Sequence, residues 1–313
     1  SYERRGELYF ADLWYLPDGP AAQFEPVILA SEAQEMAYFQ APAPTGSLTW
    51  WVPQRAVCPV DTWVHLFFAN IVFGVFTLAG RAERRAASAA FRLRARWRAL
   101  VEGKPLRASS AYVRVGRNCR IDPGTVFYGP VTLGDNVTIG PGCVISQCII
   151  GNNVTLAHSN HFHLCVLGDG CFFPWGAGGY CSAYMEGSSS AQGAVVEMSV
   201  IGRGSYIGPG TILTSFNLLP LPLRTVAGGY LVEVGLPVLG VCVGHNCRIG
   251  AGLLIYPART VESDVVLLAS SSRRVIMKSV SYEESDHHAT RAADLHPRLY
   301  PRAGEGDFLE PSW

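Results

Sequence analysis

The sequence has few charged residues and no excess of either sign. Charged residues make up 16% of the chain, and 25 Lys and Arg balance 25 Asp and Glu. A domain that binds nucleic acid usually carries a surplus of positive charge, so this balance argues against nucleic acid as a partner. The 313 residues are enough for one large or two ordinary domains with a buried core.

The sequence also lacks paired CxxC motifs, and no signal peptide is expected. The first residues, S-Y-E-R-R-G-E-L, do not have the apolar run of a secretory leader. The nine cysteines are an odd number, and most lie where small apolar residues would. We therefore expect free, mostly buried thiols in a reducing compartment. The predicted localisation is cytoplasmic, with membrane association as an alternative. The cysteines within the repeats described next are Cys119, Cys143, Cys165, Cys171, Cys242 and Cys247.

What is present is an apolar residue at every sixth position, with one five-residue step. Gly usually follows it, and Asn or Gly returns two or three residues later. An α-helix repeats at about 3.6 and a half-buried strand at 2, so neither explains a period of six. Gly and Asn adopt the left-handed backbone region easily, which indicates short strands joined by sharp bends. The apolar positions are Val115, Ile121, Phe127, Leu133, Ile139, Ile145, Ile150 and Leu156.

Three such units close one triangular coil, and stacked coils bury the repeated apolar residues in a continuous column. The predicted fold class is therefore mainly β: a parallel β-helix of hexapeptide repeats, between an N-terminal α-containing region and a C-terminal extension. A β-sandwich would need turns every 8–12 residues instead.

We expect the β-helix at 111–280, with insertions at about 174–197 and 214–240. The first is rich in Gly and Ser, and the second resembles a loop followed by a hairpin. Long excursions from a regular scaffold commonly carry function. The polar, proline-containing segment 281–313 is expected to extend over a neighbouring subunit.

In the N-terminal region, 1–110, a helix is predicted at about 62–100, with Asp61 as its N-cap. Its first half is apolar on all sides, and its second half is basic with an apolar stripe. One interpretation is a helix buried against the coils or a partner subunit. The other is membrane contact through residues 62–100. A membrane span needs ~20 apolar residues, and the apolar run here is close to that length but is interrupted by His65 and Asn70. The stripe consists of Ala86, Ala90, Leu93, Trp97 and Leu100.

Two stretches carry a resemblance to a known family. Residues 201–217 read I-G-R-G-S-Y-I-G-P-G-T-I-L-T-S-F-N, and residues 239–259 read L-G-V-C-V-G-H-N-C-R-I-G-A-G-L-L-I-Y-P-A-R. They resemble the left-handed β-helix acyltransferase domain of sugar-nucleotide enzymes. The resemblance implies left-handed coils, a homotrimer, active sites between subunits and an acyl-CoA donor.

The function expected from this resemblance is acyl transfer to a sugar nucleotide or a similar polar acceptor. The alternative is a non-catalytic trimeric scaffold, anchored to a membrane or a partner through the N-terminal helix. Three departures from the family bear on the choice. Gln192 stands at the family's catalytic His position, and Asn217 lies two residues beyond the family's substrate-contacting Asn. Residues 1–110 replace the family's nucleotidyltransferase half.

Acyl transfer needs a general base with a pKa near 7, usually His. The candidate catalytic residues are His158, His163 and His245. For the run of histidines at 158–163, which includes His161, packing and metal binding remain alternatives.

The candidate substrate-binding residues are Asn217, Arg224 and Arg259, because an arginine can hold a phosphate bidentately. No metal is expected. The zinc-dependent γ-class carbonic anhydrases have His in the pattern I-G-H-G-x-V-I-H-G-C, whereas this chain has Pro141 and Ser146 at those places.

Overall fold

The structure is a computed structural model that describes residues 2–5, 8–11, 31–36, 48–53, 60–217, 221–227, 229–289, 296–302 and 304–305. It divides into two compact units, one of residues 1–37 and 47–56 and the other of the rest of the chain. The described residues of the first unit form two antiparallel strand pairs. These are β1 (Tyr2–Arg5) with β2 (Leu8–Ala11), and β3 (Ser31–Met36) with β4 (Leu48–Pro53).

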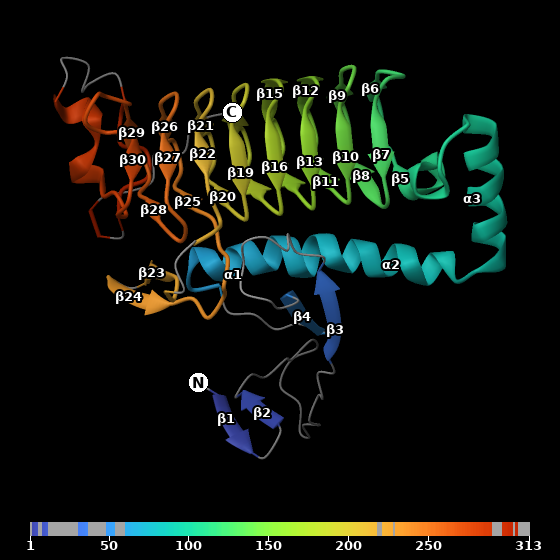
Figure 1. Cartoon of the computed structure of the whole chain (residues 1–313), viewed down its shortest axis with the longest axis horizontal. Helices are drawn as coiled ribbons and strands as arrows, with labels where there is room; N and C mark the ends of the chain where they lie inside the picture. Colours follow the sequence, from blue (N-terminus) through green and yellow to red (C-terminus); the bar gives the residue numbers. More distant parts are fainter. Residues whose placement is uncertain are drawn as a thin grey trace. The chain divides into compact units, whose positions relative to one another are not determined.

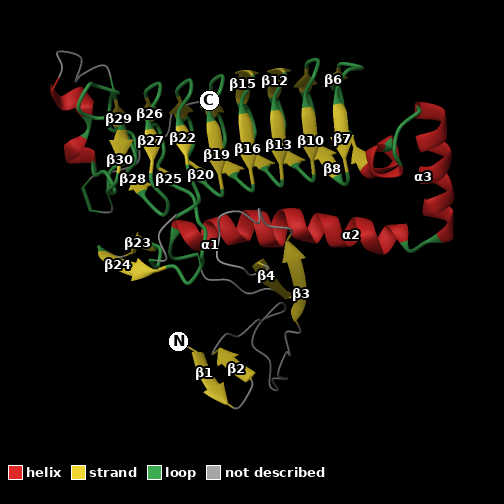
Figure 2. Cartoon of the chain, in the orientation of Figure 1, coloured by secondary structure: helices red, strands yellow, loops and turns green. Residues whose placement is uncertain are grey.

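The second unit is built on a parallel β-helix with three eight-stranded sheets, which confirms the predicted fold class (Figures 1 and 2). The first sheet contains β5 (Val113–Arg114), β8 (Val131–Leu133), β11 (Ile149–Ile150), β14 (Val166–Leu167), β17 (Ala183–Tyr184), β20 (Val200–Ile201), β25 (Cys242–Val243) and β28 (Thr260–Val261). The second contains β6 (Arg120–Ile121), β9 (Thr138–Ile139), β12 (Thr155–His158), β15 (Phe172–Trp175), β18 (Ser189–Ser190), β21 (Tyr206–Ile207), β26 (Arg248–Ile249) and β29 (Val266–Leu267). The third contains β7 (Val126–Tyr128), β10 (Val144–Ser146), β13 (His161–His163), β16 (Gly178–Tyr180), β19 (Val195–Glu197), β22 (Ile212–Leu213), β27 (Leu254–Ile255) and β30 (Val275–Ile276).

The repeated apolar residues stack in register and form the core. In the second sheet, Ile139 pairs with Leu156 and Leu156 with Phe173, and all three are buried. The bends between the first and second sheets, which we call the first corner, have left-handed backbone where the repeat places Asn. Asn136 and Asn153 have φ of 58° and 56° there. The sequence pattern therefore identified both the column and its bends.

The stretch 174–197 is not an insertion, contrary to the prediction. It forms the strands β15 to β19, paired in register with their neighbours. The inward residue of β16 is Gly179, and the ring of Phe162 from the preceding coil fills its place. A Cβ on Gly179 would lie 2.8 Å from that ring. A large side chain in one coil thus fills the space above a small residue in the next. The coil at 174–197 therefore forms without an apolar residue at every sixth position.

Three aromatic rings fill this part of the core. The centroid of Phe173 lies 4.8 Å from that of Phe162 and 5.1 Å from that of Tyr184, in edge-to-face geometry. Such pairs are favourable beyond the area that they bury.

The chain leaves the β-helix between β22 and β25, in the region expected for the second insertion. This segment forms an antiparallel hairpin of β23 (Arg224–Ala227) and β24 (Tyr230–Glu233). The indole Nε1 of Trp63 donates a hydrogen bond of 2.9 Å to Thr225 Oγ1, which ties the hairpin to the start of the helical segment.

The predicted helix at 62–100 consists of two helices. The first runs through α1 (Trp63–Phe68), the π-helical η1 (Ala69–Phe76) and α2 (Thr77–Ala86). Its N-cap is Thr62, whose hydroxyl accepts from the N–H of His65, and not Asp61 as predicted. The second helix, α3 (Ala89–Glu102), starts after Ser88, and its direction differs from that of α2 (Figure 1). The described residues also form the short 3-10 helices η2 (Leu106–Ala108), η3 (Ser110–Tyr112), η4 (Tyr282–Glu284) and η5 (Asp286–Ala289).

The first helix packs on the outer face of the first sheet, as one of the two interpretations predicts. Phe67, Ile71 and Val75 are completely buried, and a Cβ on Gly74 would lie 3.7 Å from Ile149 Cδ1. Among the described residues, this helix alone has the length and apolarity to cross a membrane, and 33% of its apolar window is buried.

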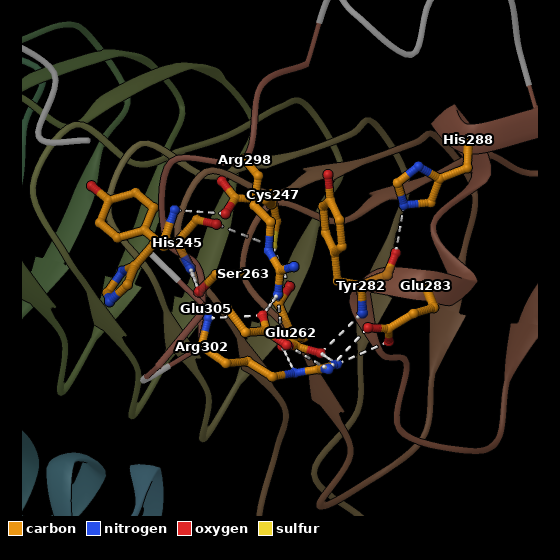
Figure 3. A network of polar contacts seen from close by, with 12 residues as sticks. His245, Cys247, Glu262, Ser263, Tyr282, Glu283, His288, Arg298, Arg302 and Glu305 are labelled. Carbon is orange, nitrogen blue, oxygen red and sulfur yellow. Dashed lines mark hydrogen bonds and ion pairs between the residues drawn. The ribbon is translucent and has the colours of Figure 1, made fainter. Parts of the chain in front are cut away.

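The described part of the C-terminal extension packs on its own β-helix (Figure 3). The expected contact with a neighbouring subunit stays a prediction. The backbone N–H of Tyr300 donates to Asp264 Oδ2 at 2.7 Å. Arg302 forms ion pairs with Glu262 at 2.6 Å and with Glu283 at 2.9 Å. These contacts hold the extension on the last coils.

All eight cysteines in the described part of the chain are free. Burial raises the pKa of the Cys181 thiol and, as the main cause, that of Cys247 to about 12. These thiols therefore stay protonated and act as small apolar core residues.

Candidate functional site

The bends between the second and third sheets, which we call the second corner, carry a row of outward-facing residues. His158 pairs with Trp175 in register, and the same register continues one residue per coil in both directions. His158 is exposed, and Trp175 is 56% exposed. The corner row consists of Pro141, His158, Trp175, Gln192, Pro209, Ala251 and Ala269.

The backbone explains why this row is open. The residue after each of its middle members has left-handed φ, for example 53° at Ser159, 60° at Gly176 and 67° at Gly193. Glycine occupies most of these positions. Few side-chain atoms there can therefore cover the adjacent corner row. Backbone hydrogen bonds link the coils, such as Gly176 N–H to His158 O at 3.0 Å. The corner is thus rigid and uncovered.

A surface groove of about 450 Å³ lies at the C-terminal end of the corner row. Small residues line most of the groove and leave the backbone of the coils accessible. Arg274 is the positively charged residue among the lining residues. Arg274 is exposed and has no ion pair with any residue that the structure describes, whereas neighbouring Arg273 is paired with Asp286 at 2.6 Å. An unpaired guanidinium can bind a phosphate bidentately. The lining residues are Pro209, Ala251, Gly252, Ala269, Ser270, Ser271 and Arg274.

Two of the predicted catalytic residues face outward in neighbouring sheets. His158 stands in the corner row with its ring over Gly140, where a Cβ would come within 3.1 Å of Nδ1. His163 lies at the other end of β13, with its ring centroid 5.6 Å from that of Tyr180. Partial burial of its ring lowers the pKa of His163. His158 alone among the predicted candidates lies in the corner row.

His245 lies at the first corner and has a structural contact. Its Nδ1 accepts a hydrogen bond of 2.9 Å from the N–H of Arg203, and its ring centroid lies 4.7 Å from that of Tyr300 in the extension. Burial and then the charge of Arg203 lower the pKa of His245. Asp135 and Asn152 accept the same hydrogen bond in earlier coils. His245 occupies their offset in the repeat, and this signal was available in the sequence.

The three predicted substrate-binding residues lie around the hairpin and not at the second corner. Asn217 donates from Nδ2 to the carbonyl of Leu221 at 3.2 Å. Arg224 pairs with Glu233 at 3.2 Å across the hairpin, and Arg259 donates to the carbonyl of Arg224 at 3.3 Å. The two arginines are therefore neighbours, and the partners that they contact belong to the hairpin itself. Arg274 was not predicted from the sequence, because nothing in the local sequence distinguishes it from Arg273.

The described residues contain no group of three or more His, Cys, Asp or Glu arranged to hold a metal ion. His161 and His163 project outward from the same strand, on either side of the buried Phe162.

Comparison with known proteins shows which families have a similar repeat. Residues 112–147 match the family described as bacterial transferase hexapeptide (six repeats). The bifunctional protein GlmU of Geobacillus sp. (strain WCH70) is 34% identical over 175 residues, which cover 50% of this chain and 37% of the relative. GlmU of Pseudoalteromonas atlantica is 25% identical over 184 residues, which cover 51% of this chain and 39% of the relative. The chain thus spans well under half the length of these relatives, and the predicted relationship to hexapeptide-repeat transferases is confirmed.

Solved structures with some likeness include Arabidopsis UDP-N-acetylglucosamine acyltransferase, at 15% identity and a TM-score of 0.25, covering 54% of this chain and 60% of that one. Another is the acetyltransferase domain of PglB from Neisseria gonorrhoeae in complex with acetyl coenzyme A, at 12% identity and a TM-score of 0.20, covering 50% of this chain and 55% of that one.

Proposed function

We propose that this chain, which carries the hexapeptide repeat of bacterial transferases, transfers an acyl group from a coenzyme A thioester to a polar acceptor at the second corner. The observation that carries the proposal is the continuity of the corner row with the groove. An unpaired arginine stands at one end, and an exposed histidine stands toward the other. Acyl transfer needs a site for a phosphate-bearing donor and a base beside the reacting carbonyl.

In this proposal Arg274 holds a phosphate of the donor. The small side chains of Ala251, Gly252 and Ala269 leave room for the pantetheine arm along the stacked coils. Coils are about 4.8 Å apart, so an extended arm that follows the row leads the thioester toward Gln192. The donor therefore runs parallel to the axis of the β-helix.

The acceptor would occupy the surface between Gln192 and His158, which are two coil steps, about 10 Å, apart. Trp175 lies between them with an exposed indole face, on which a sugar ring can pack. A sugar nucleotide or another polar acceptor with a ring fits this surface. The acyl donor and the acceptor would then meet between Gln192 and His158.

His158 is proposed to remove the proton from the acceptor hydroxyl or amine as that group attacks the thioester carbonyl. The Gln192 side-chain amide can donate a hydrogen bond to the oxyanion that forms. Collapse of the tetrahedral intermediate breaks the carbon–sulfur bond, and the departing thiolate takes a proton from the imidazolium. The base would thus stand two coils before the family's catalytic position.

We also propose a homotrimer. The first helix covers the first sheet, whereas the third sheet exposes apolar side chains. Assembly through that face would bury them and place a second subunit beside the groove. The exposed residues are Val195 at 40%, Ile212 at 39%, Val275 at 48% and Met277 at 59%. Light scattering would give the mass of the assembly, and a monomer would contradict this part of the proposal.

The function is tested by following release of the coenzyme A thiol from acetyl-CoA with a panel of amino-sugar and hydroxyl-bearing sugar nucleotides. His158→Gln is expected to lower kcat by a factor of about 100 or more, the usual contribution of a general base. His65→Gln, the same change at a histidine of the first helix, should leave the rate within about twofold. A chain that neither binds acetyl-CoA nor releases thiol with any acceptor would favour the scaffold alternative.

A further inference from the structure

The helix α3 exposes its large apolar side chains and buries its small ones. Leu93 is 72% exposed, Trp97 66%, Leu100 76% and Val101 69%. At 100° per residue these four lie in one stripe along the helix. Ala95 and Ala99 are the buried residues of α3. A solvent-exposed helix normally has the opposite arrangement, so the stripe is an unpartnered surface.

The inner side of α3 is fixed to the N-terminal end of the β-helix. The ring of Phe91 packs edge-to-face on Tyr112 at 5.2 Å. Arg98 donates to Ser110 Oγ at 3.0 Å, and the N–H of Ser110 donates to Glu102 at 3.0 Å. Rotating α3 to bury the stripe would break all of these contacts. The stripe is therefore presented to the outside as a fixed feature.

Arginines border the stripe. On the helical projection Arg94 flanks one side, and Arg96 flanks the other. Residues 77–104 contain eight Lys and Arg against two Glu, a net charge of +6 in a chain whose total is zero. Six of the arginines are exposed and form no ion pair within the described part of the chain. They are Arg81, Arg84, Arg85, Arg92, Arg94 and Arg96.

We infer that α3 lies flat on an anionic lipid surface. Leu93, Trp97 and Leu100 would enter the boundary between headgroups and acyl chains, and the flanking arginines would contact lipid phosphates. A second copy of the chain fits less well, because two copies of this arginine-bordered face would repel each other. Charge complementarity thus selects an anionic bilayer as the occupant.

The inference relocates membrane contact within residues 62–100. The apolar half packs on the first sheet along one side, whereas the basic half presents a stripe with the composition of an interfacial helix. Contact through α3 leaves the second corner free. The inference is therefore independent of the proposed acyl transfer.

The test is co-sedimentation of the full chain with vesicles of phosphatidylcholine alone and with added phosphatidylglycerol. Binding is expected only with phosphatidylglycerol and should weaken as salt rises. Arg94→Gln and Arg96→Gln should each lower the partition coefficient about fivefold, because a cation near an anionic surface contributes about 1 kcal/mol. Arg117→Gln is the matched control, since Arg117 is exposed and paired with Asp135 on the first corner.

A second variant separates the lipid from other occupants. Leu93→Ser combined with Trp97→Ser should abolish binding to the anionic vesicles while circular dichroism stays unchanged. The control Tyr230→Ser with Leu231→Ser removes exposed apolar residues of the hairpin and should keep binding. Absence of vesicle binding, equal binding to neutral vesicles, or loss of self-association in the α3 variant without an effect on vesicles would overturn the inference.

Discussion

The Nδ1 atom of His245 accepts a hydrogen bond of 2.9 Å from the backbone N–H of Arg203. The N–H of His245 in turn donates to Ser263 Oγ at 2.9 Å. The same relation links Arg117 to Asp135 at 2.7 Å earlier in the β-helix. A polar side chain at the first corner thus satisfies the N–H of the preceding coil. This contact, and the ring of Tyr300 beside it, give His245 a place in the scaffold.

The effect of replacing His245 on stability should therefore depend on whether the new side chain can accept the hydrogen bond from the N–H of Arg203. His245→Ala leaves the N–H of Arg203 without its partner and should lower the free energy of unfolding by about 1–2 kcal/mol. His245→Asn supplies a side-chain oxygen, as Asn152 does, and should lower it by less. Urea denaturation measures both. Equal losses in the two variants would contradict the structural role.

Close packing between coils predicts a contrast between two glycines. A Cβ on Gly140 would lie 2.0 Å from the carbonyl oxygen of Ala157, whereas nothing lies within 4 Å of a Cβ on Gly80 in α2. Gly140→Ala should destabilise the protein by ~3 kcal/mol, because the backbone of the next coil must shift. Gly80→Ala should stabilise it by up to about 1 kcal/mol through helix propensity. Thermal unfolding of both variants gives the comparison.

The aromatic cluster predicts a graded response in the coil at 174–197. Gly179→Ala places a methyl group 2.8 Å from the ring of Phe162 and should cost about 1–3 kcal/mol. Tyr184→Phe removes only a hydroxyl that lies 3.4 Å from Ser190 Oγ, and should cost less than Gly179→Ala. Chemical denaturation measures the loss of unfolding free energy in both variants. A larger loss in Tyr184→Phe than in Gly179→Ala would contradict the prediction.

Attachment of the C-terminal extension should depend on pH. Burial is the main cause that lowers the pKa of His287 and His296, with His288 adding to the first and Arg248 to the second. The charge of Asp264 opposes both shifts. As the pH falls, both imidazoles become protonated in the unfolded state before they do in the folded state. The stabilisation is therefore complete above about pH 6.5 and is lost as the pH falls below it.

Hydrogen exchange of the extension at neutral pH and at about pH 5 measures this effect. Protection at 296–302 should decrease on acidification. A variant with His287→Gln and His296→Gln should show a smaller change between the two pH values. A protection pattern that does not vary with pH would contradict the prediction.

The sequence predicted the β-helix because its apolar residues and bends are set locally. The columns through Leu156 and the corners at Asn136 and Asn153 follow from a period that no helix or ordinary strand shares. The coil at 174–197 escaped prediction because Gly179 and Ser190 take inward positions that aromatic neighbours complete. That complementarity is a property of adjacent coils and has no signature within one repeat.

The candidate site was only partly predictable for a similar reason. His158 was visible in its histidine-rich run, but its place in one row with Gln192 depends on register across coils. Arg274 could not be distinguished from Arg273, since only the structure pairs Arg273 with Asp286. Packing of the extension on its own chain depends on ion pairs between segments far apart in sequence, such as Arg302 with Glu262.

The most direct test of the account is a calorimetric titration of acetyl-CoA into the protein and into two arginine variants. Arg274→Ala should weaken binding by a factor of about ten or more, because it removes the charge-assisted contact to phosphate in the groove. Arg117→Ala, at an exposed arginine on the opposite corner, should bind as the parent does. Equal affinity in the parent and both variants, or no heat of binding in any, would contradict a donor site at the second corner.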